Sequence, residues 1–158
     1  MNVFIGGSST AKDRAIEDGH MIASSCEDLF VHSDILSLHL RMTDTTRHIV
    51  TSSLLALMKP TSLLVNTSHP DLIETDALIA ALNRGHPGMA AVDVFENEPI
   101  LQGHALLRLE NCICTPHIGY VEIENYEAMF GAAFDNVVNY IRDTPTNIDN
   151  PGALQVLR

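Results

Sequence analysis

Three apolar runs of the chain each lead into side chains that can do acid–base chemistry. The segments that follow these runs are residues 66–69 (Asn-Thr-Ser-His), residues 93–98, which hold three carboxylates, and residues 115–119 (Thr-Pro-His-Ile-Gly). In an open parallel sheet, ligands bind beyond the carboxyl ends of the strands. If the three runs are neighbouring parallel strands, a polar segment, a carboxylate and an imidazole meet in one crevice.

His117 and Glu98 are the residues that we expect to act together as an acid–base pair. A carboxylate that is hydrogen-bonded to one ring nitrogen fixes the imidazole tautomer and raises the imidazole pKa. Such an imidazole is suited to exchange a proton with a substrate hydroxyl. Glu96 is a competing carboxylate two residues away, and either glutamate could instead be a solvated surface group.

Short strand-like runs alternate with helical patterns along most of the chain. Strands are predicted at 3–5, 20–23, 35–40, 62–66, 89–95 and 111–114, and helices at 11–18, 26–32, 51–58 and from Thr75, the expected N-cap, to Gly85. This order is typical of an α/β protein with a doubly wound parallel sheet. Because several runs lack alternation of apolar and polar residues, we expect their strands to be buried on both faces. His39, at the end of one run, is expected to be a hydrogen-bonded core residue.

A long helix is predicted at residues 121–142. Its apolar residues are spaced by 4, 4, 3 and 4 positions, at Tyr126, Phe130, Phe134, Val137 and Ile141. This spacing places them on one face of a helix. We expect that face to be part of the core.

Composition and charge exclude several classes of partner. The 158 residues include nine Lys and Arg against twenty Asp and Glu, which gives a net charge of −11. Such a chain is unsuited to nucleic acid or to an anionic membrane surface. No apolar run approaches the roughly 20 residues that span a bilayer. Three cysteines fit free thiols in a reducing compartment, so we expect a cytoplasmic protein.

Five motifs occur in the order and at the spacing of one known family. They are Ser37-Leu38-His39-Leu40, Met58-Lys59-Pro60, Leu64-Val65-Asn66-Thr67-Ser68, Asp93-Val94-Phe95-Glu96-Asn97-Glu98-Pro99 and Thr115-Pro116-His117-Ile118-Gly119. Together they resemble the nicotinamide-binding domain of the D-isomer-specific 2-hydroxyacid dehydrogenases. The resemblance implies a partial, Rossmann-like NAD(P)-binding domain over residues 1–120. Residues 121–158 would be a long helix and a tail that return to a substrate domain.

The resemblance also implies a role for each matching residue. His117 would exchange the hydroxyl proton of a small 2-hydroxy or 2-keto acid while hydride moves to or from the nicotinamide, with Glu98 as its partner carboxylate. Asp93 would hydrogen-bond the nicotinamide carboxamide. The other implied contacts of the cofactor, NAD or NADP with NAD favoured, are Leu40, Arg41, Thr43, Thr67, Ser68, His69, His117 and Gly119. No metal is expected, because Cys112, Cys114 and His117 have no further ligand with suitable spacing.

His69 departs from the family pattern. The family places an Arg at this position, where its planar fork grips the substrate carboxylate; we therefore count His69 with His117 and Glu98 as catalytic. An imidazole cannot reproduce that bidentate contact. Loss of such a partner typically costs about 2–5 kcal/mol. His69 is either a changed substrate contact or a remnant of the original one.

A second departure is the lack of the phosphate-binding sequence G-x-G-x-x-G. Gly6-Gly7 follows what resembles the family's second strand, which implies that the first strand and helix, and most of the substrate domain, are lacking. Strands 3–5 and 20–23 would then have no ladder partner toward 35–40. We expect a homo-oligomer or a chain that needs a complementing chain. The alternative function is an inactive remnant or a regulatory partner.

Overall fold

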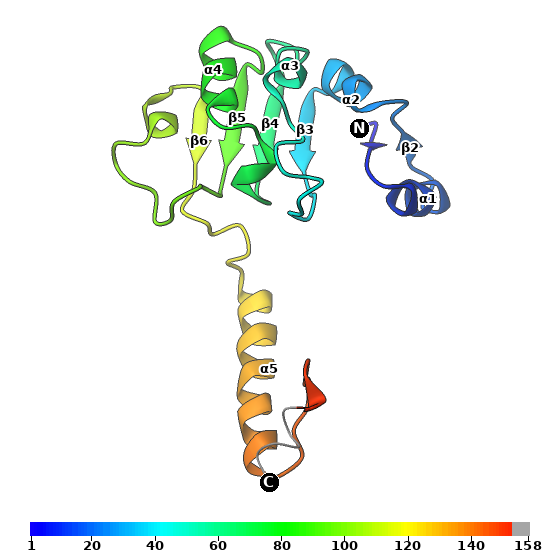
Figure 1. The fold of residues 1–158 in the computed structure, drawn as a ribbon, viewed down its shortest axis with the longest axis vertical. Coiled ribbons are helices and arrows are strands. Elements are labelled where there is room, and N and C mark those ends of the chain that lie inside the picture. The colour runs from blue at the N-terminus through cyan, green and yellow to red at the C-terminus, as the bar shows by residue number, and fades with distance from the viewer. Residues whose placement is uncertain (153–158) are drawn as a thin grey trace. The chain divides into compact units, whose positions relative to one another are not determined.

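The chain folds into two compact units. The computed structural model describes residues 1–152. The first unit, Met1–Gly119, holds the six described strands (Figure 1). The second unit begins at Tyr120 and contains helix α5 (Ile123–Ile141). Among the described residues, no helix is both long and apolar enough to cross a membrane.

The first unit contains two parallel sheets. Strand β1 (Phe4–Ile5) pairs with β2 (Met21–Ile22). The second sheet has the order β3-β4-β5-β6, with bounds Ile35–Leu38, Leu63–Asn66, Met89–Val92 and Cys112–Cys114. All three of its pairings are parallel, which confirms the predicted α/β class. Within the described residues the two sheets share no ladder, as expected for strands 3–5 and 20–23.

The helices of the first unit begin largely at polar N-caps. Their bounds are Ser9–Glu17 for α1, Cys26–His32 for α2, Ser52–Leu55 for α3 and Ala77–Arg84 for α4, with short 3₁₀ turns η1 at Pro70–Leu72 and η2 at Ala105–Arg108. The side chains of Ser8, Ser25 and Thr51 each accept a backbone N–H of the helix that follows. Gly85 ends α4 in the left-handed conformation, as predicted (φ 79°).

Three helices of the first unit have boundaries that differ from the prediction. Helix α1 starts two residues early because Ser8 caps it. Helix α3 ends at Leu55 because the N–H groups of residues 57 and 58 bond three residues back, which tightens the chain before Pro60. Helix α4 has Asp76, not Thr75, at its N-cap, since a turn closed by the Ala77 N–H and the Glu74 carbonyl precedes it.

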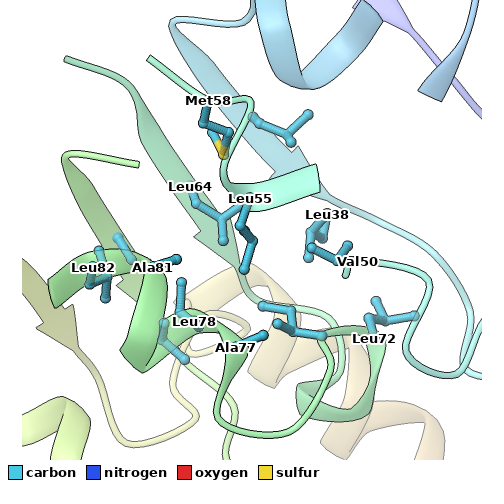
Figure 2. Close-up of a cluster of buried hydrophobic side chains, with 14 of the residues drawn as sticks. Leu38, Val50, Leu55, Met58, Leu64, Leu72, Ala77, Leu78, Ala81 and Leu82 are labelled. Atoms are coloured by element: carbon cyan, nitrogen blue, oxygen red, sulfur yellow. The ribbon is translucent and has the colours of Figure 1, made fainter. Parts of the chain in front are cut away.

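The core lies between α3, α4 and one face of the four-stranded sheet. Figure 2 shows Leu55 and Met58 over Leu64 of β4, with Leu78 and Leu82 of α4 in the same buried cluster. Leu55 and Leu64 are fully buried. This packing fixes β4 and its neighbours, and with them the positions at which the polar loops begin.

The opposite face of the same sheet is open. Ile35, Met89 and Ile113 are 62%, 45% and 56% exposed, and they alternate along their strands with buried or half-buried residues. The expectation of strands buried on both faces is therefore wrong. Within the first unit, helix α1 contacts β1 and β2, while α2, α3 and α4 contribute residues to the core on the buried face. His39 is also exposed rather than in the core, and its ring lies 2.9 Å from the Ser37 hydroxyl.

The apolar stripe of α5 is exposed as well. No residue of this helix is buried, and Phe130 and Phe134 are among the exposed aromatic residues. The expectation that the stripe belongs to a core is wrong for this unit. Up to residue 152, the unit contains one helix and a short following segment, which is too little structure to cover an apolar face.

Candidate active site

Asp93, directly after β5, holds the loop that carries His117. Its side chain is buried, and its carboxylate accepts hydrogen bonds from the Thr115 hydroxyl, from the Ile118 N–H at 2.9 Å and from the Gly119 N–H at 2.8 Å. Burial raises the pKa of Asp93, but the three hydrogen bonds outweigh burial and hold that pKa below its usual range. An ionised Asp93 therefore fixes residues 115–119.

His117 and Glu98 are in direct contact at the edge of the sheet. The Nδ1 atom of His117 lies 2.7 Å from Oε2 of Glu98, while Oε1 of Glu98 accepts the Phe95 N–H at 2.9 Å. The hydrogen bond to Glu98 raises the pKa of His117, and this bond, together with the Phe95 N–H, lowers the pKa of Glu98. Both side chains remain accessible, at 50% and 35% exposure. The pair can thus hold a proton and present it to a ligand.

The backbone of His117 adopts the left-handed conformation, with φ at 55°. For a residue other than glycine such a conformation costs on the order of 1–3 kcal/mol, and strained residues of this kind cluster at functional sites. The hydrogen bonds of Asp93 to Ile118 and Gly119 hold the chain on the far side of the strained residue. They offset the strain and keep the imidazole beside Glu98.

Glu96, the competing carboxylate, is turned toward a different imidazole. Its Oε2 lies 3.7 Å from Nε2 of His104, whose ring meets Phe95 edge to face at 5.9 Å between centroids. Of the two glutamates, Glu98 is therefore the one in contact with His117.

Asn66 organises the loop after β4. The buried Asn66 amide accepts the Ser68 N–H at 3.1 Å and donates to the His69 carbonyl at 2.9 Å. The Ser68 hydroxyl donates to the Leu40 carbonyl at 2.8 Å, which joins this loop to the one after β3. A Cβ placed on Gly119 would lie 4.0 Å from the Thr67 Cβ. The loops after β4 and β6 therefore meet, as their place at one sheet edge requires.

Three of the expected site residues are not tied to the pair by any described contact. Thr43 is engaged in a local turn with Thr45 and Thr46. His69 is exposed and precedes η1. Arg41 is exposed, and its guanidinium has no hydrogen bond or ion pair among residues 1–152. Their roles stay predictions, as do those of His117, Glu98 and Asp93.

Thr115 and Asn66 have positioning contacts that the sequence did not predict. Both stand at the boundary between a strand and its polar loop, which is the signal that could have marked them. What the sequence could not provide is the partner of each: Asp93 for Thr115, and the backbone of residues 68 and 69 for Asn66.

The two cysteines of β6 lie side by side, with 3.7 Å between their Sγ atoms. Burial raises the pKa of Cys112 to about 12, with the neighbouring Cys114 as a further cause. Across residues 1–152, no group of three or more His, Cys, Asp and Glu side chains is arranged to hold a metal ion. Both thiols contact the core cluster as small apolar groups do.

A cavity of about 260 Å³ lies beside the site, between α4 and the loop after β5. Its lining includes Asn66, Asp76, Glu96 and His104, but neither His117 nor Glu98. The acid–base pair thus lies outside the cavity, on the accessible edge of the sheet.

The residues at this edge fit the nicotinamide end of a dinucleotide. They offer an accessible imidazole with a fixed partner, and a glycine at position 119, where a Cβ would lie 3.0 Å from Oδ2 of Asp93. A side chain there would occupy the space beside the carboxylate. No glycine-rich phosphate-binding loop accompanies them in the sequence.

A parallel α/β sheet with an acid–base pair beyond its strand ends is an arrangement that dinucleotide-binding domains use. Comparison with known families makes the assignment specific. Residues 1–119 match the NAD binding domain of the D-isomer specific 2-hydroxyacid dehydrogenases, and the chain belongs to this family.

Individual relatives agree with the family. The chain is 41% identical over 133 residues to a glyoxylate reductase from Aeropyrum pernix, covering 84% of this chain and 40% of that protein. It is 40% identical over 109 residues to an (S)-sulfolactate dehydrogenase from Chromohalobacter salexigens, covering 69% and 35%. The crystal structure of an oxidoreductase from Ralstonia solanacearum is 54% identical, with a TM-score of 0.93, and covers 100% of this chain and 47% of that one. The chain spans less than half the length of each relative.

Replacing Glu98 with Gln is expected to lower the pKa of His117 toward its ordinary value of 6.5, because the charge that favours the imidazolium is removed. Titration of the His117 ring by NMR measures this change. Glu96→Gln is the matched control and should leave the His117 titration in place, since Glu96 faces His104. An unchanged His117 pKa in Glu98→Gln would contradict the pairing.

The same shifts set the pH range of the pair's contribution to stability. The raised pKa of His117 means that its contribution is complete below 6.5 and is lost as the pH rises through the folded-state pKa. The lowered pKa of Glu98 means that its contribution is complete above 4.5 and is lost as the pH falls through the folded-state pKa. The difference in the free energy of unfolding between wild type and Glu98→Gln should therefore be largest between pH 4.5 and pH 6.5.

Proposed function

We propose that this chain provides the nicotinamide-binding and proton-transfer half of a D-2-hydroxyacid dehydrogenase, which moves hydride between NAD(P) and a small 2-hydroxy or 2-keto acid. The observation that carries the proposal is the 2.7 Å contact between His117 and Glu98, beyond the ends of adjacent parallel strands. Family membership supports the reaction class, and the names of the relatives support 2-keto and 2-hydroxy acids as substrates.

The proton in this reaction is assigned to His117. When the cofactor is bound, its nicotinamide supplies or accepts the hydride. Glu98 holds the Nδ1 side of the imidazole, so the proton that exchanges with the substrate oxygen is the one at Nε2. In reduction the imidazolium donates this proton as the carbonyl oxygen gains charge, and in oxidation the neutral ring removes it. The raised pKa of His117 favours the protonated form needed for reduction.

The cofactor contacts are assigned to the loops that meet at this edge. Asp93 would hydrogen-bond the nicotinamide carboxamide while holding the 115–119 segment, and His69 would face the substrate. The backbone near Leu40, Arg41 and Thr43, together with Thr67, Ser68, His69, His117 and Gly119, would line the cofactor. NAD is favoured over NADP, in agreement with the family's description as an NAD binding domain.

We also infer that the working protein contains further polypeptide, as a second copy or a complementing chain. The open sheet face with Ile35, Met89 and Ile113 supports this inference, as does the exposed stripe of α5. Exposed apolar residues gathered on one face are typical of interaction sites.

Cys26, Cys112 and Cys114 are all free thiols, which supports a cytoplasmic location.

Titration with NADH, followed by its fluorescence, tests the cofactor assignment. We expect enhanced fluorescence that saturates with a dissociation constant below about 1 mM, equivalent to roughly −4 kcal/mol. Displacement by NAD⁺ is the control for binding at a single site. Absence of any change at millimolar NADH would favour the inactive remnant over the dehydrogenase.

A further inference from the structure

The candidate site is poor in positive charge. Asp93, Glu96 and Glu98 lie within six residues of one another, and the chain as a whole carries a net charge of −11. Glyoxylate and sulfolactate, after which two relatives are named, are anions, and a dinucleotide carries phosphates. Like charges repel, and the repulsion grows when a bound ligand displaces water from between them. A further cation, in addition to the His117 imidazolium, would therefore favour the binding of an anionic ligand.

Arg41 is an exposed cation in the loop that follows β3. It follows β3, and its guanidinium has no hydrogen bond or ion pair within the described part of the chain. Arg47, the other arginine between β3 and α3, already forms an ion pair with Asp71 at 2.7 Å. An unpaired, exposed guanidinium is ready to receive an oxyanion without first breaking an ion pair.

The backbone at Arg41 is fixed against the site loops. The carbonyl of Leu40, one residue earlier, accepts the Ser68 hydroxyl at 2.8 Å. The carbonyl of Arg41 itself accepts the Thr46 hydroxyl, also at 2.8 Å. Thr67, next to Ser68, lies beside Gly119 in the loop that carries His117. The loop that holds Arg41 is thus bonded to the loop after β4, which in turn meets the loop that carries His117. The backbone carbonyls of Leu40 and Arg41 both accept hydrogen bonds, which fixes the chain at Arg41.

We propose that Arg41 binds the oxyanion of the ligand at this site. A guanidinium presents parallel N–H donors that match a carboxylate or a phosphate, whereas the nearby His69 imidazole presents no such fork. The oxyanion is either the carboxylate of the substrate or a phosphate of the cofactor. The inference rests on the proposed dehydrogenase function and names the residue that selects for anionic ligands.

Binding measurements on Arg41→Gln, Arg41→Lys and Arg84→Gln test the proposal. Arg84 is an exposed residue in the last turn of α4, so its variant controls for the loss of one surface charge. The probes are NADH, reduced nicotinamide riboside, which lacks phosphate, and glyoxylate added to NADH-saturated protein. Arg41→Gln is expected to weaken binding of the oxyanion at least about tenfold. Arg41→Lys should recover part of the loss, and Arg84→Gln should match the wild type.

The probes identify the source of the oxyanion. Weakened binding of glyoxylate alone assigns Arg41 to the substrate carboxylate. Weakened binding of NADH, with reduced nicotinamide riboside unaffected, assigns it to a phosphate. If both affinities in Arg41→Gln stay within about twofold of Arg84→Gln, the role of Arg41 is refuted while the dehydrogenase function stands. If the wild type binds neither NADH nor glyoxylate, the proposed function fails and the role of Arg41 fails with it.

Discussion

Gly88→Ala should lower the free energy of unfolding of the first unit by at least about 4 kcal/mol. Few single substitutions cause a loss of this size, and those that do create a severe steric conflict or a comparable defect. A Cβ at position 88 would overlap the Pro60 carbonyl oxygen and would lie 2.8 Å from its carbon. Both are backbone atoms, so no side chain can move aside. The Met89 N–H bonds the Ser62 carbonyl, and the Asn111 amide bonds the Gly88 carbonyl. Displacing residue 88 therefore disturbs the pairing of β4, β5 and β6 together.

Urea unfolding followed by circular dichroism measures this loss, with Gly103→Ala as the matched control. A Cβ at Gly103 meets no atom within 4 Å, so we expect that variant to stay within about 0.5 kcal/mol of the wild type. Domains are commonly stable by only about 5–15 kcal/mol, so Gly88→Ala should be largely unfolded or close to it. Equal urea midpoints for the two variants would show that the contact with Pro60 is not as close as described.

Asp93→Asn is expected to cost about 2–4 kcal/mol of stability and to loosen residues 115–119. The substitution keeps the size of the side chain, but one acceptor oxygen becomes an NH₂ group that faces N–H and O–H donors. Two backbone N–H groups and the Thr115 hydroxyl depend on this carboxylate. His117 should lose its fixed place beside Glu98 as a result.

The effect of Asp93→Asn should depend on pH in a defined direction. The pKa of Asp93 is lowered, so its contribution is complete above the ordinary value of 3.8 and is lost as the pH falls through the folded-state pKa. Hydrogen exchange at the Ile118 and Gly119 amides, with urea unfolding at neutral and acid pH, measures both expectations. Asp44→Asn is the control, because this exposed aspartate has no hydrogen bond or ion pair among the described residues. Unchanged exchange at the two amides would contradict the positioning role.

The strand pattern was predictable because apolar runs of limited length, separated by turn residues and helix caps, are a local property. The open face of the β3–β6 sheet was not. Ile35, Met89 and Ile113 are as apolar as residues of a fully buried strand, and nothing in their own segments says whether a helix covers them. Apolarity shows which residues favour burial, while coverage depends on elements elsewhere in the chain or outside it.

The candidate site also has features that the sequence predicts and features that depend on contacts between distant segments. Spacing and resemblance placed His117 and Glu98 at neighbouring strand ends, where the structure brings them to 2.7 Å. The three donors to Asp93, and the contact of Glu96 with His104, depend on how loops distant in sequence approach each other. The requirement for glycine at position 88 is also non-local, because the atom that a side chain would strike belongs to Pro60.

The most direct test of the acid–base assignment follows the ring nitrogens of His117 by NMR while NADH is added. If the pair faces the bound nicotinamide, both nitrogen resonances should move and saturate with the dissociation constant given by NADH fluorescence. The ring-nitrogen resonances of His20, an exposed residue just before β2, should stay unchanged. If NADH fluorescence saturates while the ring-nitrogen resonances of His117 stay unchanged, the cofactor binds elsewhere and the proposed site is refuted.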